Sequence, residues 1–287
     1  MWPRPYSCLQ SWAGVWLGLM ALAANPSHAN VTVLGSLERE WPVQPGDQLH
    51  NAIEVHNPGS SPVRIRAYLK DFDPHPDGMG YQAPPTHDRS NAAWIALTPS
   101  EQVIEAGARA VVNVAISVPP VLAQEGSWWS VVMIEGSHDA GSTLATAQDP
   151  TLPSMGIRHV MRTAVRMVTT AGGPLSLAFV ERSLISDDSA HNPTISLVLG
   201  NDGHRNLHLT LHADLFDAQG QPVGRITPQQ AITRLLPGAQ VRRTLPLPEL
   251  PEGDYQAVVI ADHRGAQLFG ARYSFHLPNA KSAQVVP

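Results

Sequence analysis

Apolar and polar residues alternate along most of this chain, in short runs that turn residues interrupt. Alternation with a period of two predicts strands, and no stretch keeps a helical period over three turns. Prolines (26) and glycines (22) separate the runs at regular spacing, which favours a sandwich or barrel. The predicted strands are Val31–Leu37, Gln48–Asn57, Val63–Asp73, Ala93–Leu97, Arg109–Val118, Ser127–Glu135, Gly156–Thr170, Leu175–Arg182, Thr194–Asn201, Leu207–Asp217, Val223–Thr227, Gln240–Leu247, Tyr255–Asp262 and Gln267–Leu277.

The predicted strands form two sets of seven, the number typical of an immunoglobulin-like domain. Three landmarks recur in the same order in both sets, which indicates an internal duplication. They are an apolar strand ending in a polar turn (Ile53–Gly59, Leu197–Gly203), a turn with glycine (Glu105–Gly107, Leu236–Gly238) and Glu-Gly before an aromatic strand (Glu125–Trp129, Glu252–Tyr255). The sequence therefore predicts an all-β fold of two immunoglobulin-like β-sandwiches in tandem, joined near Ala171–Pro174.

Residues 1–29 are typical of a secretory signal peptide, with Arg4 before an apolar core and Ser27-His28-Ala29 as the cleavage site. The apolar run is too short for a membrane span. We therefore expect an exported, periplasmic protein that does not span a membrane after cleavage. The expected domains are 30–171 and 172–278, followed by a tail at 279–287.

Composition narrows the choice of partners and compartment. The only cysteine, Cys8, lies within the predicted signal peptide, so the exported chain depends on its apolar core and not on disulfides. Without Arg4, 18 basic residues stand against 24 acidic ones, a net charge of −6. This balance argues against a nucleic-acid partner.

Patterns that carry catalytic or metal chemistry are weak in this sequence. No nucleophile elbow, phosphate loop, dinucleotide fingerprint or His-Glu-x-x-His motif is present. The run Asp73–Gly78 lacks the final glutamate of a calcium loop and is better explained as a hairpin turn. His204, His208 and His212 are spaced too widely along a strand to share one metal ion, which favours a solvated strand face. We expect no enzyme activity, no metal and no cofactor.

The stretch Gly156–Thr170 is unusually long and interleaves strand-forming residues with arginines. Two interpretations are open at this point. It is either an ordinary interior strand with its arginines in solvent, or a long edge strand whose free backbone groups are available to another chain.

Two segments carry a resemblance to a known family. The run Val160–Val168 resembles the last strand of the first domain in the periplasmic chaperones of chaperone–usher (PapD-like) pilus assembly. The preceding run Ser127–Glu135 is similar to the strand before it, with an aromatic pair and a closing acidic residue. The resemblance implies two immunoglobulin-like domains and a divergent member of that family.

The resemblance also implies a binding site. Family members hold the terminal carboxylate of a pilus subunit with a basic residue on that last strand and an arginine on the first strand. The matching positions are Arg166 and Arg39. Large residues on the last strand fill the groove of the subunit, and the matching segment carries Met155, Ile157 and Met161, with His159 among them.

The first hypothesis is thus a periplasmic chaperone that binds and stabilises secreted pilin-like subunits by β-strand donation and delivers them for assembly, with an outer-membrane usher as a further partner. A self-capping dimer is another way to cover such a strand. The second hypothesis is an exported two-domain structural or adhesive module that binds a cell-surface or polysaccharide partner. It predicts that the strand is paired on both sides within the fold.

Overall fold

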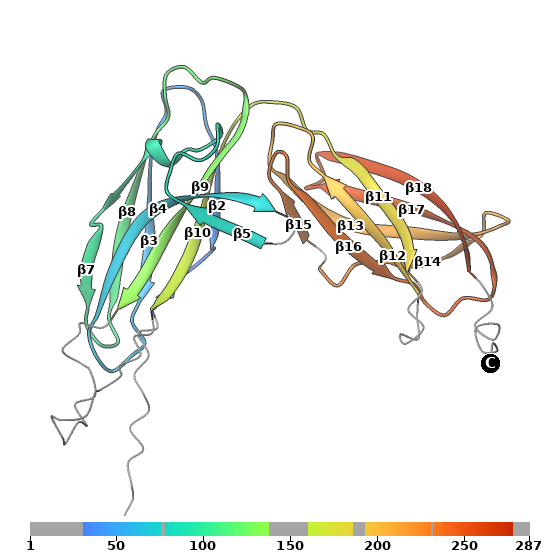
Figure 1. Ribbon diagram of the computed structural model, residues 1–287, viewed down its shortest axis with the longest axis horizontal. Helices are drawn as coiled ribbons and strands as arrows, with labels where there is room; N and C mark the ends of the chain where they lie inside the picture. The colour runs from blue at the N-terminus through green and yellow to red at the C-terminus, as the bar shows by residue number, and fades with distance from the viewer. Residues whose placement is uncertain (1–30, 76–77, 138–159, 186–192, 231, 278–287) are drawn as a thin grey trace, which may run out of the picture.

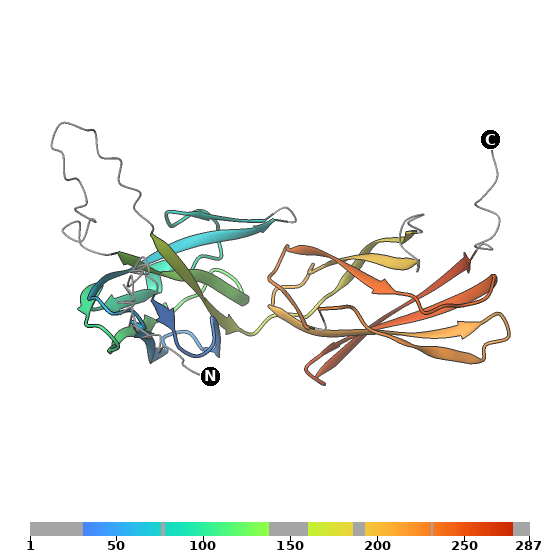
Figure 2. The same ribbon diagram turned by 90° about the horizontal axis from the view of Figure 1, so that it is seen from below.

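The computed structural model describes residues 31–75, 78–137, 160–185, 193–230 and 232–277. Figure 1 shows two β-sandwiches inclined to one another, and Figure 2 shows them end to end, linked by the short segment between β10 and β11. Apart from the 3-10 helix η1 (Ala92–Trp94), the regular structure of these residues is all strand. The predicted all-β fold of two immunoglobulin-like sandwiches is confirmed.

The first sandwich has two sheets. One has the order β1-β3-β8-β6, and the other has the order β2-β10-β9-β4-β5, with β7 also paired to β4. Their bounds are β1 Thr32–Val33, β2 Glu38–Pro42, β3 Gln48–His56, β4 Val63–His75, β5 Gly78–Gln82, β6 Ile95–Thr98, β7 Glu101–Ile104, β8 Arg109–Ser117, β9 Gly126–Ser137 and β10 Met161–Ala171.

The second sandwich also has two sheets. The orders are β11-β12-β16 and β14-β13-β17-β18, with β15 also paired to β13. The bounds are β11 Ala178–Ile185, β12 Thr194–Gly200, β13 Leu207–Asp217, β14 Pro222–Ile226, β15 Ile232–Leu235, β16 Gln240–Pro246, β17 Gly253–His263 and β18 Gln267–Leu277.

Alternation of side chains builds both cores. Successive residues of a strand point to opposite faces of its sheet, so Val112, Val114 and Ile116 of β8 are buried while the residues between them are more exposed. Val165 and Met167 of β10 belong to the same buried cluster. The second sandwich is built alike around alternate leucines of β13 and their partners on β17.

The predicted strand Val31–Leu37 is wrong in its extent, because the chain changes sheet there. Thr32–Val33 pairs antiparallel with β3 in one sheet, whereas Glu38–Pro42 pairs parallel with β10 in the other. Gly35, with a φ of 84°, lies at the break. Only glycine adopts this conformation without steric cost, so the chain bends between the two sheets here.

The sequence also missed β2, β5, β7 and β15, which are short strands that add to the sides of longer ones. The hairpin predicted from Asp73–Gly78 is present, since β4 and β5 pair antiparallel with His75 opposite Gly78.

The two sandwiches meet through closely packed backbone. The Ser127 amide donates to the His204 carbonyl over 2.7 Å, and the Asn206 amide donates to the Ser127 hydroxyl over 2.8 Å. Gly126, with a φ of 123°, lies at this contact, and a Cβ there would stand 2.1 Å from the His204 carbonyl oxygen. Glycine is therefore required for the sandwiches to approach this closely.

This requirement gives a prediction for Gly126→Ala. The substitution adds a clash with His204 to the strain of a left-handed residue, so the urea midpoint should fall. The matched control is Gly107→Ala, where φ is 69° and nothing lies within 4 Å of the added Cβ. The control should cost about 1–2 kcal/mol of unfolding free energy, and Gly126→Ala roughly 1–3 kcal/mol more. Equal losses would contradict the proposed clash.

Candidate partner-binding edge and interdomain cleft

Strand β10 is paired on both sides along only half of its length. All of its residues, from Met161 to Ala171, pair antiparallel with β9. On the other side β2 pairs only with Arg166–Thr170, and this pairing begins where the Arg166 amide donates to the Leu37 carbonyl over 2.8 Å. Within the described part of the chain, no strand covers that side of residues 161–165. Among the residues that the structure describes, the first half of β10 is therefore an open edge.

One apolar face of β10 extends past the core of its own sandwich. Met161, Thr163, Val165 and Met167 lie on the same face by alternation. Val165 and Met167 are fully buried, whereas Met161 is 47% exposed. The predicted contact residues Met155, Ile157 and His159 lie outside the described residues. Met161 is thus the one member of the predicted set that can be placed, and it lies at the start of the open edge.

Arg166 lies on the same strand face as Glu38, a residue that lines the cleft between the sandwiches. Its Nη1 lies 3.0 Å from Glu38 Oε2, on the residue directly opposite in β2. Its guanidinium also lies 5.4 Å from the centre of the Phe72 ring on β4. The side chain of Arg166 keeps 30% of its surface exposed. A cation on an aromatic face with accessible surface can still take up an anionic group.

Arg39 lies on the other face of the same sheet. It is opposite Met167, so its side chain points toward β3, and its Nη1 donates to the Asn51 side chain and the Ala52 carbonyl. Burial lowers the pKa of Arg39. The structure therefore does not bring Arg39 and Arg166 together on one face. Joint binding of a carboxylate by this pair stays a prediction.

Sequence reasoning missed the groups that lie beside Arg166. A cleft of about 850 Å³ separates the sandwiches at β2. Its ionisable lining residues are Glu38, Glu40 and Asp47 from the first sandwich and Arg205, His208, Arg234 and Arg264 from the second. The sequence signal for this cleft was the alternation of Glu38 and Glu40, which places both on one strand face. Which way that face points follows only from the pairing of β2 with β10.

His208 is at the centre of the charged contacts. The Arg264 guanidinium, which can only donate, lies 2.7 Å from His208 Nδ1. Nδ1 therefore accepts, and Nε2 carries the proton toward Glu40 Oε2 at 2.6 Å. His208 is 9% exposed. The predicted solvated face of His204, His208 and His212 is thus wrong for His208, because the first sandwich covers it.

The environment of His208 shifts the pKa of two neighbouring groups, Glu40 and His263. Burial alone would raise the pKa of Glu40, but the His208 hydrogen bond and the charge of Arg264 outweigh it and hold the pKa below its ordinary 4.5. Burial lowers the pKa of His263, whose Nδ1 accepts from the His208 amide. Both shifts favour the folded form at neutral pH, with Glu40 charged and His263 neutral.

The adjacent tryptophans of β9 point in opposite directions, as strand geometry requires. Trp128 packs on Trp94 inside the first sandwich, with ring centres 5.0 Å apart. Trp129 stacks on His87 at 4.7 Å and belongs to the buried cluster that includes the core of the second sandwich. The prediction that one ring lies in the core and the other at an interface is confirmed.

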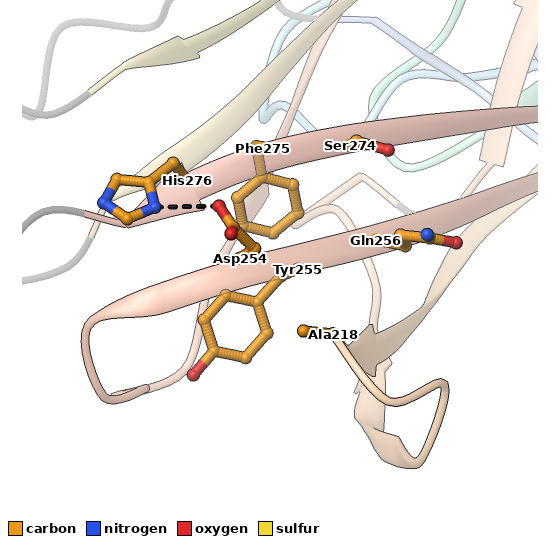
Figure 3. Close-up of a pocket in the computed structure, with 7 residues that line it drawn as sticks. All are labelled: Ala218, Asp254, Tyr255, Gln256, Ser274, Phe275 and His276. Carbon is orange, nitrogen blue, oxygen red and sulfur yellow. Dashed lines mark hydrogen bonds and ion pairs between the residues drawn. The ribbon is translucent and has the colours of Figure 1, made fainter.

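A second hollow, of about 430 Å³, lies on the second sandwich and is shown in Figure 3. Asp254 and His276 point toward one another there, 2.9 Å apart, and Ser274 lies away from this pair. The three side chains therefore do not form a catalytic relay. The rings of Tyr255 and Phe275 stack on each other, and Tyr255 is 8% exposed. Little aromatic surface is thus presented to a sugar.

Within the described ranges, no group of three or more His, Cys, Asp or Glu side chains could hold a metal ion. In the same ranges no helix is long and apolar enough to cross a membrane. The predicted signal peptide, residues 1–29, lies outside the described residues.

Comparison with known proteins gives a fold-level likeness. No family model matches the chain, and no curated protein matches it. Among solved structures, the class 5 fimbriae chaperone CfaA is 10% identical, with 87% of this chain and 100% of that chain covered at a TM-score of 0.43. The Salmonella enterica SafA pilin–SafB chaperone complex is 14% identical, with 86% and 96% covered at 0.40. The Acinetobacter baumannii CsuC–CsuE chaperone–tip subunit pre-assembly complex is 13% identical, with 84% and 97% covered at 0.41.

The predicted structural resemblance to pilus-assembly chaperones is therefore present. Identities of 10–14% with TM-scores below 0.5 carry no argument about function.

The cleft contacts predict how stability changes with pH. The lowered pKa of Glu40 means that the unfolded chain takes up a proton first as the pH falls below 4.5, so stability is lost as the pH falls through the folded pKa. The lowered pKa of His263 removes stability in the same direction, starting below 6.5. The urea midpoint should therefore decrease in two stages between neutral and acid pH.

Glu40→Gln should lower the urea midpoint at pH 7 and reduce the more acidic stage, to which Glu135 and Asp214 also contribute because their arginine partners lower the pKa of each carboxyl group. The matched control is Glu54→Gln, which removes an exposed carboxylate paired with Arg109 at 3.0 Å, far from the cleft. The control should keep both stages. An unchanged acidic stage in Glu40→Gln would show that this carboxylate does not link the sandwiches.

Proposed function

We propose that this protein is a periplasmic, non-enzymatic chaperone that binds and stabilises pilin-like fibre subunits by lending them strand β10, and that delivers them for assembly at an outer-membrane usher. The observation that carries the proposal is the open half of β10, Met161–Val165, whose apolar face continues past its own core. An open edge strand that carries an exposed apolar side chain such as Met161 is normally suppressed in proteins. An open edge strand is expected in a protein whose partner pairs with that edge.

Backbone pairing would fix the register of the bound subunit. The Arg166 amide points toward β2, so by alternation the backbone groups of Arg162 and Ala164 point to the open side. A subunit strand added there extends the sheet of β10, β9 and β4. Because a one-residue shift would move every side chain to the wrong face, the register is set by the pattern of apolar residues.

Apolar side chains would supply most of the binding energy. Met161 and the predicted residues Met155 and Ile157, with His159 between them, alternate on one face in the sequence. Inserting each large apolar side chain into an incomplete subunit core contributes about 1.5–3 kcal/mol. Several such insertions outweigh the cost of ordering the segment, which is about 1–2 kcal/mol per residue for the backbone.

The two predicted anchors would have unequal parts. Arg166 is partly exposed beside the cleft-lining Glu38 and can take a subunit carboxylate by a charge-assisted, bidentate bond. Arg39 ties β2 to β3 through Asn51 and Ala52, and so keeps β2 beside the second half of β10. Its contribution to carboxylate binding would then pass through the placement of β2.

The first test is capture of subunits encoded beside the gene, measured by co-purification with the full chain. Met161→Glu places a charge on the edge and should reduce capture by tenfold or more. The matched control, Val111→Glu, changes a 43% exposed valine on β8 of the opposite sheet and should leave capture unchanged. Failure of the unaltered protein to capture any subunit would overturn the proposal in favour of an adhesive module.

The second test separates the anchors. Arg166→Ala should reduce capture, and it should lower the free energy of unfolding by about 1–3 kcal/mol because the buried Glu38 carboxylate loses a hydrogen bond. Arg39→Ala should lower the urea midpoint because its two hydrogen bonds hold β2 in place. Undiminished capture by the Arg39→Ala, Arg166→Ala double variant would remove the anchor assignment.

A further inference from the structure

Strand β2 brings a carboxylate of the chain itself to the cation that the proposed function assigns to a subunit. Glu38 Oε2 lies 3.0 Å from Arg166 Nη1, and Glu38 Oε1 lies 3.2 Å from Arg234 Nε. The Glu38 side chain is only 9% exposed. The two cations come from different sandwiches, since Arg166 is on β10 and Arg234 is on β15. The Glu38 side chain is therefore buried in the cleft between two cations and does not extend over the surface.

The groups that the basic side chains of the cleft already bind are carboxylates. A second carboxylate of β2, Glu40, is held in the same way by His208 at 2.6 Å and Arg264 at 3.3 Å. Arginine forks match the geometry of carboxylates. Both occupied sites thus hold carboxylates, Glu38 beside Arg166 of β10 and Glu40 beside His208 and Arg264 of the second sandwich.

Glu38 is the less completely bound of the two. Its Oε1 is buried and makes no well-aligned hydrogen bond, although Arg234 is near. Both oxygens of Glu40 are hydrogen-bonded, one from Thr170 and the other from Arg264. A buried acceptor without a directed donor costs about 1–3 kcal/mol. A carboxylate that is not tied to β2 can orient both oxygens toward the two guanidinium groups.

We propose that Glu38 is a resident competitor, and that the cleft takes up an incoming carboxylate by exchange with Glu38 at Arg166 and Arg234. This inference rests on the proposed function and concerns the regulation of the same site. The ligand is a carboxylate of an extended peptide, either its free carboxyl terminus or an acidic side chain. In the free protein the Glu38 carboxylate keeps the cations neutralised and lowers the affinity for stray anions. Only a peptide that also pairs with β10 gains enough to displace it.

The test uses synthetic decapeptides in which valine alternates with serine, titrated into the full chain by calorimetry. One peptide has a free carboxyl terminus, one is amidated, and one is amidated with an internal aspartate. Glu38→Gln should bind the free-terminus peptide about tenfold more tightly than the unaltered protein and should bind the amidated peptide equally. The arm that gains affinity, terminus or aspartate, identifies the source of the carboxylate.

Two further variants keep this test decisive. Glu54→Gln removes an exposed carboxylate bound to Arg109 and should leave every peptide affinity unchanged. Glu38→Asp keeps the charge but shortens the side chain, so it should give a gain between those of the unaltered protein and Glu38→Gln, even if Glu38→Gln folds poorly.

Equal or weaker binding of the free-terminus and aspartate peptides by Glu38→Gln overturns the proposed exchange, and so does the absence of any preference for carboxylate peptides over the amidated one. These outcomes are distinct from failure of the proposed function, which is decided by subunit capture in the unaltered protein.

Discussion

The parallel pairing of β2 with only the second half of β10 is the constraint on which the rest of this structure depends. It closes the first sandwich from Arg166 to Thr170 and leaves Met161 to Val165 without a partner on that side in the described chain. The same pairing sets the face on which Glu38 and Glu40 lie. One register therefore determines both where the edge is open and which charges enter the cleft.

Charged contacts orient the sandwiches more than they stabilise them. Removing charges from water is expensive, and buried ion pairs often contribute little net stability. Glu40 with His208 and Arg264, and Glu38 with Arg234, instead join strand β2 to the second sandwich at defined points. Apolar contact accompanies them, because Val168 and Trp129 belong to the same buried cluster as the core of the second sandwich. Burial thus supplies the attraction and the ion pairs define the position.

The open edge of β10 and the charged cleft beside it impose two separate conditions on a partner. An edge strand alone attracts any exposed strand, including a second copy of the same chain. A cleft that selects carboxylates adds a requirement on the end or the side chains of the partner. Discrimination then arises from the difference between partners that satisfy both conditions and partners that satisfy one.

Local pattern was sufficient for the longer strands and for the fold class. Alternation on β8, β13 and β17 has a period of two over many residues, and one buried face suffices to specify such strands. The short strands β2, β5, β7 and β15 were missed because four or five residues carry little periodicity, and pairing with a longer neighbour supplies what the pattern lacks. The single strand expected over Val31–Leu37 was wrong because pattern does not reveal a change of sheet.

The sequence by itself determined the alternation that makes this chain all-β, the presence of two sandwiches, and the position of Arg166 on a long strand. Only the tertiary structure decided that β2 covers half of β10, that Arg39 points to the opposite face from Arg166, and that His208 is buried against Glu40. The physical reason is that a side-chain period is local, whereas the pairing of two strands more than a hundred residues apart, and the burial of one sandwich against another, depend on the whole folded chain.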